Sequence, residues 1–432
     1  MSEAHREGEA ALSLHPRTGR EEREHHAEAR RREFDRLIES AGCRPVVSRS
    51  MLLRTLHPAT LFGAGQVASI GAEVTRHGAT VAFVDHPLTP VQQRNLERAW
   101  NCKVVDRTGL ILEIFAARAR TREGVLQVQL ASLNYQVSRL VRSWTHLERQ
   151  RGGYGFMGGP GERQIELDRR MIRRQIKKLH TELARVRTRR ATQRAGRRRK
   201  ALPVVALVGY TNAGKSTLFN RLTAASVHAD DQLFATLDPT LRQADLGDGA
   251  AVILSDTVGF VQALPHELID AFHATLEEVT QADLILHVRD IADRESLRQK
   301  EVVEETLHRL FPDDAAIPPV VELLNKCDLT PQVTGAIHEA ENGGRIAISA
   351  ATGAGIDRLR AFLRDWVRRR WVERTLTIPA ADGAAIAWCH RHGRVLEIAH
   401  QREYCLLRCL LPPQTPLPKG VTARRTAERT PR

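Results

Sequence analysis

Apolar and polar positions alternate along two regions of the chain in a way that predicts parallel α/β sheets. In residues 31–122 and again in 201–371, short apolar runs are followed by segments whose apolar residues lie three or four positions apart. A buried strand followed by an amphipathic helix, repeated, is typical of a parallel sheet covered by helices. We predict an N-terminal parallel α/β domain over 31–122 and a doubly wound α/β domain over 201–371. The expected strands are 80–84 and 103–105, then 204–208, 251–255, 284–288, 320–324 and 346–348.

Residues 123–200 have helical periodicity and lack the strand pattern. Apolar residues recur at helical spacing from Leu126 to Leu147 and again from Ile165 to Val186. In the second stretch the later apolar residues follow steps of four and three, the spacing of a coiled-coil seam. A glycine-rich stretch with two aromatic residues separates the two stretches. We predict an antiparallel helical hairpin with a glycine-rich tip.

The two ends of the chain have different patterns. Residues 1–30 are dense in Glu, Arg and His, and we expect a charged tail without a stable fold. From residue 372 onward, short alternating segments punctuated by glycine predict a small C-terminal α/β domain, which ends in a disordered tail and completes the range 372–432.

Positive charge is concentrated in the second helix of the hairpin. The formal net charge is +14, and residues 162–200 alone hold 16 Lys and Arg against 4 Asp and Glu. A solvated helix face explains most charge runs. This run, however, has one sign and adjoins a tip whose aromatic residues could stack on bases. We expect contact with RNA rather than duplex DNA, because the sequence has no DNA-reading motif.

Cysteine usage and hydropathy indicate the compartment. The six cysteines contain no C-x-x-C pair, so neither a disulfide framework nor a zinc site is expected. No apolar run approaches the ~18 residues that span a membrane, and the charged N-terminus is unlike a signal peptide. We expect a cytoplasmic protein without membrane-spanning segments.

Residues 209–216 (GYTNAGKS) form a glycine-rich loop between an apolar run and the start of a helix. This is the setting of a phosphate-binding loop, where backbone N–H groups and a helix N-terminus face the phosphates. Lys215 would reach the β- and γ-phosphates, and the Ser216 hydroxyl would bind Mg²⁺. The loop alone predicts a nucleoside triphosphate and does not say which one.

The loop after strand 251–255 has residues suited to the γ-phosphate. Asp256 can hold Mg²⁺ through water, and the Gly259 N–H can meet the γ-phosphate. Phe260 stands where many GTPases place a Gln that orients the attacking water. An apolar side chain cannot do this, so we expect slow intrinsic hydrolysis, with the missing element supplied by a partner or a cation. Asn212 offers an amide oxygen that could help to bind K⁺.

Two further stretches select the base. Residues 325–328 (NKCD) follow one expected strand, and the Asp328 carboxylate can accept two hydrogen bonds from guanine, whereas adenine lacks that pair of donors. Ser349 and Ala350 follow another strand and would complete the base pocket. Four such stretches occur in order, each at a strand end. They favour a GTPase over an ATPase and over a chance match to the motifs.

Together with the phosphate loop, several stretches resemble the HflX family of translational GTPases. They are 106–112 (DRTGLIL), 158–162 (GGPGE), 166–170, 234–240 (FATLDPT) and 256–260 (DTVGF), and the resemblance covers about residues 31–371. It helps to select Thr236 as the second protein ligand of Mg²⁺, with Thr240 as the alternative. The expected catalytic residues are Lys215, Asn212 and Gly259, and the expected metal ligands are Ser216, Thr236 and Asp256. The expected nucleotide-binding residues are Gly209, Tyr210, Thr211, Asn212, Ala213, Gly214, Lys215, Ser216, Thr217, Phe234, Ala235, Thr236, Leu237, Asp238, Asp256, Thr257, Val258, Gly259, Asn325, Lys326, Asp328, Ser349 and Ala350.

The resemblance implies a cytoplasmic GTPase that binds the large ribosomal subunit and its rRNA through the hairpin. Its hydrolysis of GTP to GDP would be stimulated by the ribosome, and it would split stalled ribosomes under stress; we expect a monomer. One alternative is a passive subunit-binding, anti-association or assembly factor in which hydrolysis only drives release. A second is ATP-dependent rRNA remodelling through the N-terminal domain, where Asp85 and Asp106 follow strands. There, Gln66 stands where family members often have Lys, which weakens the case for bound ATP.

Overall fold

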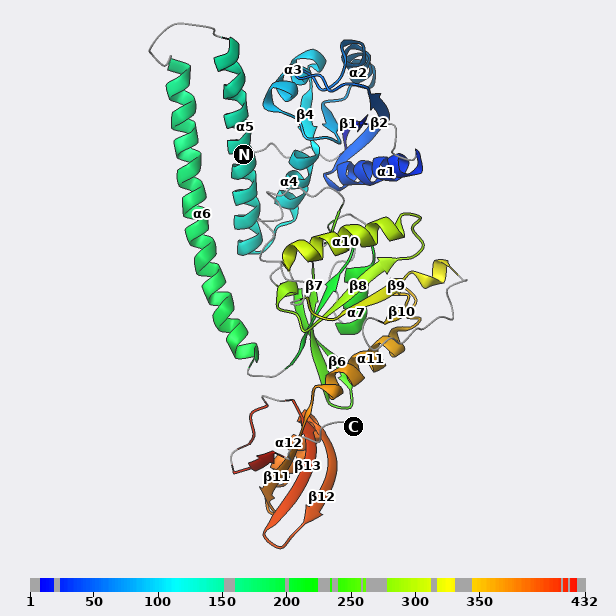
Figure 1. The fold of residues 1–432 in the computed structure, drawn as a ribbon, viewed down its shortest axis with the longest axis vertical. Helices are drawn as coiled ribbons and strands as arrows, with labels where there is room; N and C mark the ends of the chain where they lie inside the picture. Colours follow the sequence, from blue (N-terminus) through cyan, green and yellow to red (C-terminus); the bar gives the residue numbers. More distant parts are fainter. Residues whose placement is uncertain are drawn as a thin grey trace. The chain divides into compact units, whose positions relative to one another are not determined.

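The computed structural model describes residues 8–18, 24–150, 160–198, 202–223, 234, 240–257, 259–261, 278–311, 317–330, 344–412, 415–418 and 420–425. The chain divides into two compact units. The first contains the N-terminal domain and the hairpin as far as Val186, and the second contains the phosphate-loop domain and the C-terminal domain. Figure 1 labels the elements of both units along the chain.

A four-stranded parallel sheet in the order β2-β1-β3-β4 is the centre of the N-terminal domain (Figure 1). Parallel strands require crossover connections, and helices supply them here. Apolar residues of strands and helices, such as Leu12 and Ile70, pack into one core. The elements are β1 (Glu9–Thr18), α1 (Glu24–Ser40), β2 (Cys43–Leu53), α2 (Ala64–His77), β3 (Val81–Val84), α3 (Pro90–Trp100), β4 (Lys103–Asp106) and α4 (Arg107–Arg118).

The expectation that residues 1–30 are a tail without a fold is wrong for most of that stretch. β1 pairs with both β2 and β3, so it lies inside the sheet, and its central apolar residues are fully buried. Two polar residues, Ser13 and His15, interrupt the apolar pattern of this strand. Both are buried, and their side chains hydrogen-bond to each other at 2.9 Å. The domain therefore begins well before residue 31. Residues distant in sequence allow this strand to be buried despite its polar side chains.

Two long helices, α5 (Arg122–Gln150) and α6 (Pro160–Arg198), follow the N-terminal domain and pair as a hairpin (Figure 1). Leu126 and Leu130, near the start of α5, pack against Leu183, far along α6, as an antiparallel pair requires. Arg122 and Glu182 add an ion pair at 3.7 Å. The expected glycine-rich tip lies almost entirely outside the described residues.

The phosphate-loop domain is built on a six-stranded sheet in the order β10-β9-β8-β5-β7-β6. Every neighbouring pair is parallel except β6 and β7. The sequence pattern does not predict β6, an antiparallel edge strand whose exposed residues are polar. The elements are β5 (Val204–Val208), α7 (Lys215–Thr223), β6 (Thr240–Gly247), β7 (Ala250–Asp256), β8 (Leu284–Asp290), α10 (Ser296–Leu310), β9 (Val320–Asn325), a 3₁₀ turn (Cys327–Leu329), β10 (Arg345–Ala347) and α11 (Ile356–Arg369).

The C-terminal domain is an antiparallel sheet in the order β12-β13-β11-β14 with one helix. The expectation that the chain after Pro412 is disordered is wrong for residues 422–425, because β14 pairs with β11. Across the described residues, no helix is both long and apolar enough to cross a membrane. The elements are β11 (Val372–Pro379), α12 (Gly383–His392), β12 (Arg394–His400), β13 (Tyr404–Leu411) and β14 (Thr422–Arg425).

Candidate nucleotide-binding site

The glycine-rich loop lies between β5 and α7, where the sequence predicts a phosphate-binding loop. β5 ends at Val208, and α7 begins at Lys215. Gly214 has a φ of 93°, and a Cβ atom there would lie 2.3 Å from Asn325 Nδ2. Any other residue would therefore be strained and would push this loop away from β9. The loop leads directly into the N-terminus of α7, the kind of helix end at which anions bind.

Lys215 is buried at the base of this loop. Its Nζ donates hydrogen bonds to the carbonyl oxygens of Gly209 (3.0 Å) and Tyr210 (2.8 Å). Burial lowers the pKa of Lys215 to about 8, although the nearby Asp256 carboxylate opposes this shift. Phosphate groups would supply the negative charge that favours the ammonium form.

Ser216 and Asp256, expected to bind Mg²⁺ directly and through water, lie side by side. The Ser216 hydroxyl donates to Asp256 Oδ2 at 2.9 Å, and Asp256 is fully buried at the end of β7. The next residue, Thr257, anchors the loop by donating its hydroxyl to the Leu207 carbonyl at 2.6 Å. A hydroxyl and a carboxylate are the hard oxygen donors that suit Mg²⁺. The residues present therefore fit the ion.

The segment expected to close over the γ-phosphate is described only in part. Ala235, Thr236, Leu237 and Asp238 lie outside the described residues, as does Val258. Phe234 is buried, and its ring packs edge-on against Phe115 of α4, with 4.6 Å between ring centroids. Thr240, the alternative metal ligand, begins β6 and pairs with Asp256 in the ladder.

Phe260 is joined to the phosphate loop through its backbone. Its N–H donates to the Gly209 carbonyl (3.1 Å), and its carbonyl accepts from the Thr211 N–H (2.8 Å). The Phe260 side chain is buried. A buried apolar ring provides no group that could orient water in the site.

Asn325 connects the phosphate loop to the loop that follows β10. Its Nδ2 donates to the Ala213 carbonyl (2.7 Å), and its Oδ1 accepts from the Ala350 N–H (2.9 Å). Lys326 has a left-handed φ of 63° and pairs with Asp290 at the end of β8 (2.7 Å). These contacts fix the backbone on both sides of the expected base pocket.

Asp328 and Ser349, both expected in the base pocket, differ in exposure. Asp328 is exposed in the 3₁₀ turn, where its carboxylate can reach a ligand, whereas Ser349 is fully buried and accepts from the Thr352 N–H at 3.1 Å. Arg221 is not predicted from the sequence, yet its guanidinium donates from Nε to the Ala350 carbonyl at 2.6 Å. No motif or spacing signals this contact, because it depends on where a carbonyl oxygen points.

The two aspartates that follow strands in the N-terminal domain are engaged with protein groups. Asp85 pairs with Arg107 (2.9 Å) and with Arg30 (2.8 Å), and Asp106 accepts from the Gly109 N–H (2.8 Å). Both carboxylates are buried. They hold the domain together and do not present oxygens to a ligand.

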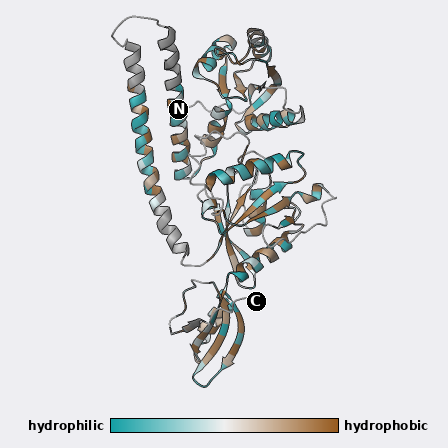
Figure 2. Cartoon of the chain, in the orientation of Figure 1, coloured by the Kyte–Doolittle hydropathy of each residue, from teal (hydrophilic) through white to brown (hydrophobic). Residues whose placement is uncertain are grey.

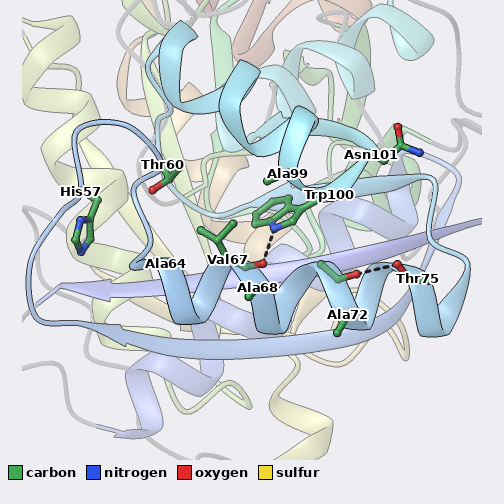
Figure 3. Close-up of a pocket in the computed structure, with 11 residues that line it drawn as sticks. His57, Thr60, Ala64, Val67, Ala68, Ala72, Thr75, Ala99, Trp100 and Asn101 are labelled. Carbon is green, nitrogen blue, oxygen red and sulfur yellow. Dashed lines mark hydrogen bonds between the residues drawn. The ribbon is translucent and has the colours of Figure 1, made fainter.

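Gln66 has a structural role at the start of α2. Its Oε1 accepts from the Gly63 N–H at 3.1 Å, which gives a backbone donor at the N-terminus of the helix a partner. Beside α2 and α3 lies a hollow of about 710 Å³ (Figure 3). Trp100 forms part of its wall and donates its indole N–H to the Val67 carbonyl (3.0 Å). Small and apolar residues predominate in the lining, and no Lys or Arg among the described residues faces it: His57, Thr60, Ala64, Val67, Ala68, Gly71, Ala72, Thr75, Ala99, Trp100 and Asn101.

Family models match three successive parts of the chain. Residues 28–116 match "GTP-binding GTPase N-terminal", residues 118–197 match "GTP-binding GTPase Middle Region", and residues 204–326 match "50S ribosome-binding GTPase". These ranges correspond to the N-terminal domain, the hairpin and most of the phosphate-loop domain.

Curated relatives resemble the chain over most of its length. A GTPase HflX of Magnetococcus marinus is 50% identical over 381 residues, which is 88% of each chain. That of Escherichia coli K12 is 47% identical over 353 residues, or 81% of this chain and 82% of the relative. That of Lacrimispora saccharolytica is 40% identical over 381 residues, or 88% and 89%. Such identity, shared across both chains, shows that this protein belongs to the HflX family of GTPases.

Proposed function

We propose that this GTPase binds the large ribosomal subunit through its helical hairpin and splits stalled ribosomes under stress. GTP favours the bound state, and hydrolysis resets the protein. The description of the family model that matches residues 204–326, a 50S-binding GTPase, supports the choice of partner. The proposal places the protein in the cytoplasm, where ribosomes are.

The observation that carries this proposal is the charge on α6. Six exposed Lys and Arg side chains lie along α6 between residues 170 and 185. Among the described residues, none of them forms an ion pair with a carboxylate. Figure 2 shows the polar character of this stretch. The opposite side of the helix is occupied, because Ile176, Leu179 and Leu183 pack toward α5. A one-signed row on the face of α6 opposite α5 suits the phosphates of rRNA. The cations are Arg170, Arg173, Arg174, Lys177, Lys178 and Arg185.

In the proposed GTP complex, Lys215 and the loop backbone neutralise phosphate charge. Ser216 and Thr236 hold Mg²⁺, and Asp256 holds it through water. The ion would offset the charge on the β- and γ-phosphates. Gly259 meets the γ-phosphate through its N–H. Asp328 accepts from guanine within the frame that Asn325, Lys326, Ser349 and Ala350 provide.

Hydrolysis is slow until the ribosome stimulates it, because Phe260 cannot orient water. Asn212, whose φ of 60° places it in a left-handed turn of the phosphate loop, helps to bind K⁺ there. Replacement of K⁺ by Na⁺ should slow hydrolysis. Equal rates in the two salts would remove K⁺ from the mechanism.

Sedimentation of purified ribosomal subunits with the full chain and a GTP analogue tests the role of the hairpin. The charge-reversal variant carries Arg174→Glu and Lys178→Glu on α6, and the matched control carries Arg358→Glu and Arg369→Glu on exposed positions of α11. Each phosphate that the protein no longer neutralises should flatten the dependence of log K on log salt by about 0.7–0.9. The α6 variant should therefore bind more weakly and with less salt dependence than the control. Equal binding by both variants would overturn the proposal.

The same assay separates splitting from the passive alternative. If a non-hydrolysable analogue supports complete splitting of stalled ribosomes, hydrolysis drives release only. A variant with residues 152–161 shortened reports on the expected tip, since normal binding would exclude the tip from the interface.

Remodelling of rRNA by ATP is tested with Lys215→Ala. ATP hydrolysis that survives this change would assign a second nucleotide to the N-terminal domain.

A further inference from the structure

The hydroxyl of Thr211 is a buried polar group in the phosphate loop. The residue is 6% exposed, and within the described part of the chain its Oγ1 has no hydrogen-bond partner. Buried hydroxyls are usually bonded, because leaving one without a partner costs free energy. A hydroxyl that is unbonded in the protein alone is therefore available to bond with a ligand.

Thr211 lies directly against the glycine proposed to meet the γ-phosphate. A Cβ atom on Gly259 would lie 2.8 Å from Thr211 Cα, 2.8 Å from Thr211 Cγ2 and 3.0 Å from Lys215 Nζ. The threonine methyl group and the lysine ammonium thus both border the position that a Cβ atom of Gly259 would take. Any larger residue at position 259 would displace one of them.

Backbone hydrogen bonds hold Thr211 in this position. Its N–H donates to the Phe260 carbonyl at 2.8 Å, while the Phe260 N–H donates to the Gly209 carbonyl at 3.1 Å. The two loops therefore form a short ladder with Thr211 at one rung. The alternative hydroxyl nearby, on Thr257, is already bonded to the Leu207 carbonyl at 2.6 Å.

We propose that the Thr211 hydroxyl acts on the γ-phosphate and the attacking water, and so partly replaces the side chain that Phe260 lacks. This inference rests on the proposed placement of the γ-phosphate between Lys215 and Gly259. The hydroxyl donates a hydrogen bond to a γ-phosphate oxygen and accepts one from the water. A neutral hydroxyl cannot serve as a strong base, so its role is to orient the water and stabilise charge.

The reaction balances without any proton exchange at Thr211. The water oxygen forms a bond to the γ-phosphorus as the bond from that phosphorus to the bridging oxygen of GDP breaks. The protons of the water end on the released phosphate or in solvent. Thr211 keeps its own proton throughout, and GDP and inorganic phosphate are the products.

Single-turnover hydrolysis by the full chain without ribosomes tests this role. Thr211→Val keeps the shape and removes the hydroxyl, and Thr211→Ser restores it. We expect a rate loss on the order of a hundredfold for Val and a rate close to the original for Ser. Thr223→Val, which removes a hydroxyl from the last turn of α7 (Oγ1 to the Phe219 carbonyl, 2.7 Å), serves as the control and should keep the rate.

Nucleotide binding distinguishes a catalytic role from a structural one. GDP lacks the γ-phosphate, so Thr211→Val should bind fluorescent GDP as tightly as the original chain. The enhancement of its binding by aluminium fluoride, which mimics the transferred phosphoryl group, should be lost. A normal rate for Thr211→Val, or a parallel loss of rate and GDP affinity, would overturn the inference. Neither result would bear on ribosome binding, because no ribosome is present.

Discussion

The Tyr135 hydroxyl lies 2.6 Å from Asp106 Oδ1, and this contact joins α5 of the hairpin to the end of β4 in the N-terminal sheet. The same carboxylate caps α4 through the Gly109 N–H and lies 3.4 Å from the Arg139 guanidinium. Burial raises the pKa of Asp106, although Arg139 opposes the shift. One buried side chain therefore serves two domains of the first unit.

Tyr135→Phe should loosen the junction between α5 and the N-terminal domain. The change removes one hydrogen bond to a buried acceptor, a loss of about 1–3 kcal/mol. Hydrogen exchange in residues 122–139 should become faster, while exchange in the phosphate-loop domain stays unchanged. Tyr404→Phe is the control, because Tyr404 is exposed in the C-terminal domain. Unchanged exchange in α5 would show that the contact does not hold the helix.

Asp328→Asn should change the base preference of the site from guanine to xanthine. An amide can donate to the xanthine carbonyl that replaces the exocyclic amine of guanine, whereas it leaves a guanine donor unpaired. We expect GTP affinity to fall by about a hundredfold or more, with a gain for XTP, measured by competition against a fluorescent nucleotide. A loss of affinity for both nucleotides would point to a folding defect and against base recognition by this carboxylate.

Nucleotide binding should take up a proton at alkaline pH. Burial lowers the pKa of Lys215 to about 8, and bound phosphates should raise it. At about pH 9 the empty site holds a partly neutral amine, which gains a proton as GDP binds, whereas at about pH 6 it is already charged. The heat of binding in buffers with different ionisation enthalpies measures this uptake. Uptake that is equal at the two pH values would exclude Lys215 as its source.

His15 should make the N-terminal sheet less stable as pH rises. Burial alone would lower the pKa of His15, but the carboxylates of Asp35 and Asp85, each 3.6 Å away, outweigh it and raise the pKa. Burial opposes ionisation of Asp85 too, but Arg107 and Arg30 hold its pKa well below the usual range. A raised histidine pKa adds stability that is complete below the unfolded value and is lost as pH rises through the folded value.

Hydrogen exchange of the β1 amides, corrected for intrinsic rates, measures this effect. Protection should be greater at about pH 5.5 than at about pH 8.5. His15→Gln cannot ionise and should abolish the difference. A pH dependence that persists in this variant would have to come from another group.

The sequence predicts the fold best where burial follows from local pattern. The strand Val204–Val208 has the expected bounds, because its apolar run is buried in the core. β1 and β6 are not predicted, for different reasons. β1 buries Ser13 and His15, which need distant partners, and β6 is an edge strand with a polar exposed side.

Much of the candidate site can be inferred from motifs, because strand ends in a parallel sheet converge on one edge. Ser216 and Asp256, forty residues apart, are thus expected to be neighbours, and they lie 2.9 Å apart. The sequence does not predict the hydrogen bonds of Asn325 to two separate loops. Nor does it predict the hydrogen bond from Arg221 to the Ala350 carbonyl. Such contacts depend on the direction of individual carbonyl groups, which spacing does not encode.

The pairing of Arg107 with Asp85 and Glu33 has a consequence for synthesis of the chain. During synthesis, Glu33 and Asp85 are added to the chain before Arg107, the residue that pairs with both of them. Until Arg107 leaves the exit tunnel, closing the sheet around Asp85 would bury a charge without its strongest partner. A nascent chain that ends at β3 should therefore remain open to proteases, and folding of this domain should wait for β4 and the first turn of α4.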